Sequence, residues 1–111
     1  MPPDYDGRRF RGTEYAPDED APVATYRQRG DLLWAEFEGG AVRRGSLAGI
    51  CSADGTLEFT YSMVLAGGTI LAGHCRSTPE TLPDGRIRLH ERWERYGPHA
   101  ATGTSQLEEL R

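Results

Sequence analysis

The clearest pattern in the chain is a strict alternation of apolar and polar positions over residues 87–96. Ile87, Leu89 and Trp93 fall on one face of an extended segment, because successive side chains of a β-strand point to opposite sides. Glu91 has the same parity, whereas the opposite face is charged or polar. The segment therefore predicts a strand that carries one carboxylate in line with its apolar side chains.

Similar strand patterns recur along the chain and are separated by turn signals. The expected strands cover residues 9–15, 24–29, 32–38, 42–51, 57–65, 70–77, 87–96 and 104–110. Asp54-Gly55 is the strongest hairpin signal, since both positions accept positive φ. Residues 1–8 are expected to form a loose leader, and residues 9–111 a single domain.

The short connections favour an antiparallel meander, in which each strand pairs with its neighbours in the chain. Only the final segment, "SQLEEL", is arguable as a helix. A meander of eight strands can close into a barrel, whose interior either is filled by side chains or holds one small ligand. The predicted fold is thus all-β, a single antiparallel up-and-down β-barrel of about eight strands, with a two-sheet sandwich as the alternative.

The faces that point into this barrel are clear for some strands and ambiguous for others. In residues 57–65 the interior set is Leu57, Phe59, Tyr61, Met63 and Leu65, and in residues 104–110 Leu107 marks a weaker inward face with Ser105 and Glu109. For residues 70–77 we place the face with Gly73 and Cys75 inside, because small residues make room for bulky rings. In residues 32–38, Trp34 and Glu36 have one parity and Leu33, Ala35 and Phe37 the other, so the inward face stays open. An error of one residue would invert either assignment.

Composition narrows the functional classes. A chain of 111 residues with net charge −4 and no long basic run is a poor match for nucleic acid, which needs a basic patch. No apolar run approaches the ~20 residues of a membrane helix, so we expect a cytoplasmic protein without a membrane partner. Cys51 and Cys75 are expected to be free thiols. The histidines lack metal-ligand spacing and no nucleotide or hydrolase motif is present, so no metal and no cofactor are expected.

Glu91 is the candidate for function, because an ionised carboxylate without a partner is costly in an apolar interior. It would pair with an inward arginine, for which Arg44 and Arg76 are candidates, or be hydrated in a cavity. Alternatively its pKa is raised and it exchanges protons, or it has a structural role and bonds to Tyr61 or to a tryptophan N–H.

Four blocks of the sequence resemble a family of small bacterial proteins. They are "WAEFEGG" (34–40), "GSLAGICSADGTLEFTY" (45–61), "GHCRSTPETLPDGRIRLHERW" (73–93) and "GTSQLEEL" (103–110). Many members of that family carry the label N-acetylglutamate synthase. The resemblance implies a calycin-like, lipocalin-type barrel and transfers no catalytic residue. The nearest match to an acetyl-CoA pyrophosphate loop, residues 27–32, lacks the second small residue and is followed by a strand where a helix N-terminus is needed.

The resulting hypothesis is a barrel whose partly apolar cavity binds a small molecule. The predicted ligand-binding residues are Trp34, Glu36, Arg44, Tyr61, Arg76, Glu91 and Trp93. One alternative is a cofactor-free cyclase, isomerase or hydratase in which Glu91 and Tyr61 act as acid and base. Another is a filled barrel that forms a homodimer through Leu32, Phe37 or Leu110 on its outside.

Overall fold

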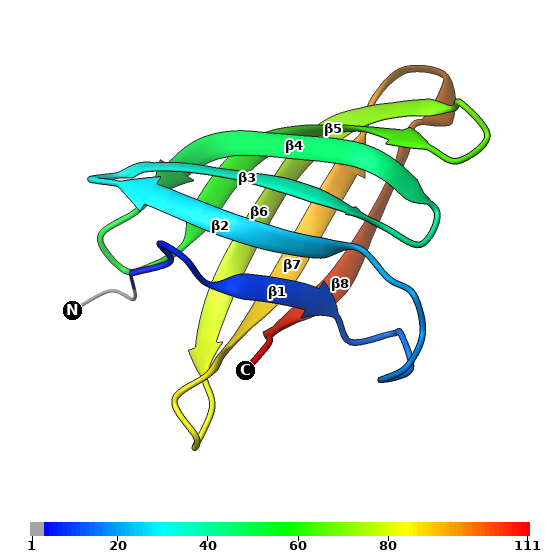
Figure 1. Cartoon of the computed structure of the whole chain (residues 1–111). Helices are drawn as coiled ribbons and strands as arrows, with labels where there is room; N and C mark the ends of the chain where they lie inside the picture. Colours follow the sequence, from blue (N-terminus) through cyan, green and yellow to red (C-terminus); the bar gives the residue numbers. More distant parts are fainter. Residues whose placement is uncertain (1–3) are drawn as a thin grey trace.

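The computed structural model describes residues 4–111 and shows a closed antiparallel barrel of eight strands. Each strand pairs with the next in the chain, and the last closes onto the first (Figure 1). The strands are β1 (Arg9–Gly12), β2 (Val23–Arg29), β3 (Leu32–Gly39), β4 (Val42–Cys51), β5 (Leu57–Leu65), β6 (Ile70–Thr81), β7 (Ile87–Arg95) and β8 (Ala101–Glu109), with a short 3₁₀ helix, η1 (Gly97–His99), before β8. The predicted fold class is confirmed.

The strand boundaries differ from the expected ones mainly at three ends. β1 stops at Gly12, β6 continues to Thr81, and β8 begins at Ala101 and replaces the possible helix. The extension of β6 includes Pro79, which pairs with β7 only, because the ladder between β5 and β6 ends at Ser77. A proline is tolerated on such an unpaired edge, where its missing N–H removes no ladder bond.

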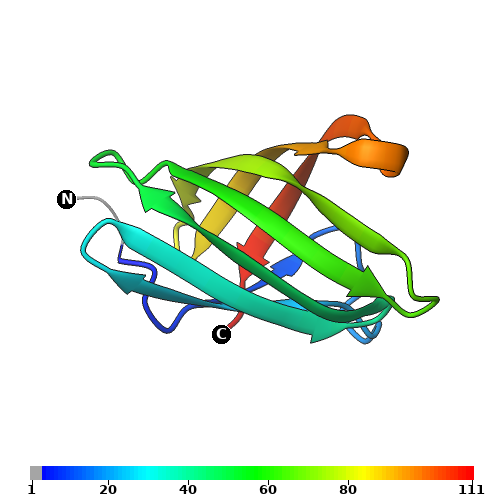
Figure 2. The ribbon, with the colours of Figure 1, turned by 90° about the horizontal axis from the view of Figure 1, so that it is seen from above.

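The two ends of the barrel are built from different connections. One end, here called the floor, carries the tight turns at residues 30–31, 52–56 and 82–86 together with both described chain ends (Figure 1). The other end, the mouth, carries the longer loop at residues 13–22 and the connections at 40–41, 66–69 and 96–100. Seen from a second direction, the strands surround a common interior (Figure 2).

The floor is closed by aromatic packing that involves the N-terminal segment. The Tyr5 ring is fully buried, and its hydroxyl donates to the Gly55 carbonyl oxygen at 2.7 Å. The rings of Tyr5, Phe10 and Tyr26 pack with centroid separations of 4.9–6.4 Å. Residues 4–8 are therefore not the loose leader that we expected, because a large ring there fills the barrel end; residues 1–3 lie outside the described residues.

The core next to this aromatic cluster is apolar and tightly enclosed. Leu33, Leu57 and Leu89 are 0% exposed and Ile87 is 2% exposed. Complete burial of such a side chain contributes about 1.5–3 kcal/mol relative to its exposed state. These residues come from β3, β5 and β7, so they tie opposite sides of the barrel together at the floor.

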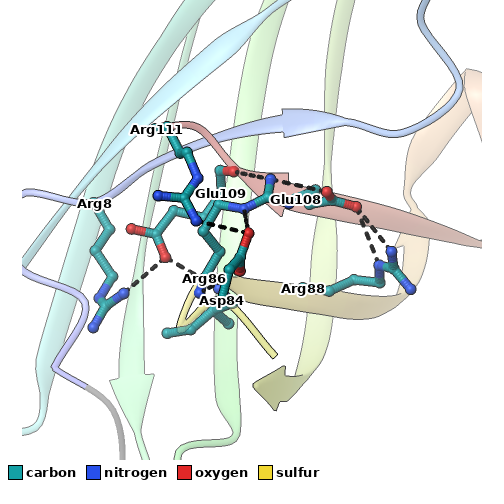
Figure 3. Close-up of polar contacts among 8 residues, drawn as sticks. Arg8, Asp84, Arg86, Arg88, Glu108, Glu109 and Arg111 are labelled. Carbon is teal, nitrogen blue, oxygen red and sulfur yellow. Dashed lines mark hydrogen bonds and ion pairs between the residues drawn. The ribbon is translucent and has the colours of Figure 1, made fainter. Parts of the chain in front are cut away.

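A network of ion pairs reinforces the place where β8 closes onto β1 and β7 (Figure 3). The ladder between β1 and β8 is short, running from Phe10 to Gly12. The network links the β6–β7 turn, the end of β8 and the segment before β1; its pairs are Arg8–Glu109, Arg86–Asp84, Arg86–Glu108, Arg88–Glu108 and Arg111–Asp84, at 2.7–3.0 Å. Hydrogen bonds from Arg86 hold the pKa of the Asp84 carboxyl well below its usual range. The network therefore favours closure at the point where few backbone bonds secure it.

Candidate ligand-binding site

A pocket of about 470 Å³ lies inside the barrel and extends to the mouth. Its walls are mainly apolar and aromatic and include Phe10, Phe37, Phe59, Met63, Trp93 and Leu107. Its polar lining residues include Tyr26, Tyr61, Cys75, Glu91, Arg95 and Ser105. Glu14 and Tyr15, from the β1–β2 loop, and Leu65, at the end of β5, lie at the mouth side. The interior beyond the packed floor is thus a mostly apolar space with a few polar groups.

Four inward aromatic rings lie directly across the ladder from glycines. The pairs are Phe37 with Gly45, Phe59 with Gly49, Tyr61 with Gly73 and Trp93 with Gly103. A Cβ at position 103 would lie 2.4 Å from Trp93 Cζ2, which is impossible without movement of the ring. At Gly45, Gly73 and Gly103 the missing Cβ leaves room for the ring of Phe37, Tyr61 and Trp93 beside the neighbouring strand. Gly73 and Cys75 are buried inside, so the predicted inward face of residues 70–77 is confirmed.

Glu91 projects from β7 into this interior between two serines. Ser77 on β6 and Ser105 on β8 are its direct cross-strand neighbours. Ser77 Oγ donates to Glu91 Oε2 at 3.0 Å, and Ser105 Oγ donates to Oε1 at 3.2 Å. Burial raises the pKa of the Glu91 carboxyl, and the hydrogen bonds from the serines lower it in part. The carboxyl group is therefore held against the wall, with its protonated form favoured relative to an exposed glutamate.

The expected ion pair between Glu91 and an inward arginine was wrong. Arg44 and Arg76 were its candidate partners, but both lie on the outer surface, where Arg44 pairs with Glu36 at 2.7 Å and Arg76 approaches Glu58 at 3.7 Å. A register shift in β4 lies between Val42 and Arg44, where the alternation cannot be extended by counting. Neither arginine lines the pocket.

Trp34 and Glu36 also lie outside the pocket, contrary to our prediction. β3 buries Leu33 and Ala35 and directs Phe37 into the pocket, so the opposite parity faces outward. Trp34 is half-buried on that outer face, with the Arg29 guanidinium 5.9 Å from its ring centroid. Phe37 is consequently not available for an outer homodimer surface.

Tyr61, Glu91 and Trp93 are the predicted site residues that the structure brings together in the pocket lining. Tyr61 is half-buried, and burial raises the pKa of its hydroxyl, while the neighbouring Arg95 lowers that pKa in part. Cys75 adds a thiol 3.6 Å from Glu91 Oε2. Burial raises the pKa of this thiol strongly, so Cys75 lacks the thiolate character of a reactive cysteine. Both cysteines are free, as expected.

Tyr26 and Arg95 are polar pocket residues that sequence reasoning did not place in the site, and Cys75 and Ser105 are two more. The Tyr26 hydroxyl is buried and has no hydrogen-bond partner among residues 4–111, and the same holds for Arg95 Nε. Arg95 has the parity of Glu91 and Trp93, so the alternation that identified them could have found it two residues further on. Tyr26 gave no such signal, because its strand has no clear apolar face.

A closed up-and-down barrel with an interior pocket open at one end defines a calycin-type protein. A family model described as avidin-like protein matches residues 3–110. The chain therefore belongs to the avidin-like family. A comparison with curated proteins found no match. Among the described residues, no helix has the length and apolar character needed to cross a membrane.

Proposed function

We propose that this protein binds a small, partly apolar organic molecule inside the barrel. The observation that carries the proposal is the Tyr26 hydroxyl, which lines the pocket, is buried and has no hydrogen-bond partner in residues 4–111. An unsatisfied buried polar group costs about 1–3 kcal/mol. A ligand with a polar atom at this position would remove that cost, which would favour binding.

The remaining lining supports the same function. Small-molecule sites are mostly apolar, with a few polar groups that fix orientation, and occupy about 300–1,000 Å³. The pocket of about 470 Å³ lies within that range. Trp93 and Phe59 offer flat apolar walls, while Glu91 and Ser105 place polar atoms on one side. A neutral Glu91 carboxyl would donate a hydrogen bond that an ionised one cannot.

Membership of the avidin-like family adds independent support, because members of that family bind small ligands. Ligands of the biotin kind are associated with the family, so biotin is the first compound to test. The lining residues fit a small molecule with apolar and hydrogen-bonding parts.

The first experiment is native mass spectrometry of the protein purified from its own cells. A retained small molecule is the expected result. The retained compound, or biotin when none is retained, is then titrated into the wild type and into Tyr26→Phe, with calorimetry as the measurement. Tyr26→Phe is expected to weaken binding about tenfold, because it removes one buried hydrogen bond.

Tyr96→Phe is the matched control, since the Tyr96 side chain is half exposed and does not line the interior pocket. This variant should bind like the wild type. Unchanged affinity in Tyr26→Phe, or the absence of any ligand that perturbs interior residues, would contradict the proposed function.

The alternative function is that of an enzyme, a cyclase, isomerase or hydratase that uses Glu91 and Tyr61. Recovery of the bound compound after incubation distinguishes this function from binding alone. Binding without reaction returns it unchanged. Ser77, Ser105 and Cys75 hold the Glu91 carboxyl group in a fixed orientation by hydrogen bonds, which suits a group that orients a ligand. The pocket argues against the filled-barrel alternative; a homodimer through Leu32, which is 45% exposed, is tested by light scattering.

A further inference from the structure

Among the described residues, no carboxylate lies within ion-pair distance of Arg95, which in this respect differs from half of the other twelve arginines. Six of the others have such a partner: Arg8, Arg44, Arg76, Arg86, Arg88 and Arg111. Arg95 is also the one basic side chain among the described residues that line the pocket. Its Nε atom is buried without a hydrogen-bond partner. A fixed positive charge therefore faces the pocket without an internal counter-ion.

The guanidinium is held in place by aromatic neighbours. Arg95 Cζ lies 5.0 Å from the centroid of the Trp93 ring, within the range of a cation–π contact. The Tyr61 hydroxyl lies beside it and is influenced by its charge. A planar guanidinium fixed by stacking has less freedom to lose when it binds a partner. It can offer parallel N–H donors to both oxygens of a carboxylate.

From these observations we infer that Arg95 and the Tyr61 hydroxyl form an anion subsite for the carboxylate of the bound ligand. The inference rests on the proposed function and narrows it to organic acids. Arg95 is the last residue of β7, at the mouth side, whereas Glu91 lies deeper. Four residues along a strand span about 13 Å between Cα atoms. The ligand would thus extend along Trp93, with its carboxylate toward the mouth.

Two carboxylates also line the pocket and act against an anion. Glu14 is exposed at the mouth side, and solvent screens its charge. Glu91 lies deeper, and burial raises the pKa of its carboxyl group. Neither is within 4.0 Å of the Arg95 guanidinium as an ion-pair partner. The carboxylate of a ligand would therefore meet an uncompensated arginine rather than displace an existing salt bridge.

The test compares 5-phenylpentanoic acid with its primary amide, which has the same shape and no charge. Trp34→Phe is the background, since it leaves Trp93 as the one tryptophan and makes its fluorescence a direct signal from the pocket. The acid is expected to bind about tenfold more tightly than the amide, because a charge-assisted hydrogen bond is stronger than a neutral one. Calorimetry at two salt concentrations gives the affinities.

The decisive variant is Arg95→Gln, and its matched control is Arg92→Gln. Arg92 is exposed on the outer face of the same strand, so the control makes the same charge change outside the pocket. Arg95→Gln should remove the preference for the acid, because it weakens binding of the acid more than binding of the amide, whereas Arg92→Gln should keep the preference. Tyr61→Phe should reduce the preference by a smaller factor. If Arg95→Gln fails to fold, Tyr61→Phe and Arg95→Lys replace it in the test. Both variants should then show a smaller preference for the acid over the amide.

The possible failures are distinguishable. Equal binding of acid and amide by the wild type, or a preference that survives in Arg95→Gln, overturns the anion subsite and leaves binding in the barrel intact. Binding of neither compound, together with no retained molecule in native mass spectrometry, overturns the proposed function and this inference with it.

Discussion

The floor and the mouth of this barrel are made by the same strands, yet they differ in what their inward side chains do. On β7, Ile87 and Leu89 are almost completely buried, whereas Glu91, Trp93 and Arg95 are only partly buried. On β5, Leu57 and Phe59 are buried, whereas Tyr61 and Met63, which follow on the same face, are half-buried. Each of these strands thus contributes to a packed core in its floor half and to a pocket wall in its mouth half.

The difference comes from what fills the interior at each end. Tyr5 enters the floor from outside the strands and packs against Phe10 and Tyr26. At the mouth half, the rings of Tyr61 and Trp93 lie over glycines and line the pocket. We therefore expect substitutions at the floor to change stability, and substitutions at the mouth to change binding.

The largest effect is expected at the floor, from Leu89→Ala. Leu89 is 0% exposed, and truncation of a buried leucine costs about 2–5 kcal/mol through lost burial and the cavity left behind. Urea denaturation measures the free energy of unfolding. Leu32→Ala, on the outer face and 45% exposed, is the control and should change that free energy by less than about 1 kcal/mol. Equal losses in the two variants would show that the floor is not the stabilising end.

A smaller effect on stability, with a larger effect on binding, is expected from Gly103→Ala. The atoms nearest to a new Cβ belong to the Trp93 ring, so the ring rather than the backbone has to move into the pocket. Such overpacking costs about 1–3 kcal/mol. Trp93 fluorescence in the Trp34→Phe background should shift, and the affinity for the ligand should fall.

Gly68→Ala is not a suitable control for this prediction, because the φ of Gly68 is +90°. Gly67→Ala is better, since nothing lies within 4 Å of a Cβ there and the residue is at the mouth end. It should leave both the fluorescence and the affinity unchanged. A Gly103→Ala variant that binds with wild-type affinity would show that the flat orientation of the ring does not define the pocket.

The smallest expected effect is a change in how the free energy of unfolding depends on pH in Glu91→Gln. Burial raises the pKa of Glu91 in the folded state, so the folded protein binds this proton more tightly than the unfolded chain does. The wild type therefore loses stability as the pH rises from the unfolded pKa of about 4.3 through the raised folded value. Glu91→Gln lacks this loss, so its stability relative to the wild type should increase over that window.

The measurement is urea denaturation between pH 4 and pH 8. Glu94→Gln is the control, because Glu94 is exposed on the outer face of β7 and its stability curve should run parallel to that of the wild type. Parallel curves for Glu91→Gln as well would mean that the pocket wall does not desolvate the carboxyl group.

The parts of the fold that follow from local pattern could be predicted from the sequence. β4 and β5 begin and end where the turn glycines indicate, and the inward face of β5 is evident because its outer residues are polar. The inward face of β3 was ambiguous, because Trp34 and Phe37 lie on opposite faces and are both large and aromatic. The local pattern does not show which of the two rings points inward. Long-range pairing decides the matter, because Phe37 lies across from Gly45, which has room for its ring.

The candidate site was predictable where it follows the alternation and not where it depends on distant neighbours. Glu91 and Trp93 were found because they share a face with Ile87 and Leu89. The outward positions of Arg44 and Arg76 were missed, because charge complementarity suggested partners for Glu91 that the strand geometry does not allow. The serines that hold Glu91 come from β6 and β8, so their role appears only when the strands are paired.

The glycines opposite the aromatic rings have a consequence for how such barrels diversify. Each of these glycines has a hydrogen atom where any other residue has Cβ, and this leaves room for the facing ring. The space for a ligand therefore depends on positions that need not contact the ligand. Exchange of one such hydrogen for a methyl group would tilt a ring and reshape the interior, while every recognition group stays chemically the same. New ligand preferences in barrels of this design can therefore arise by single-codon changes on strands adjacent to those that carry the recognition groups.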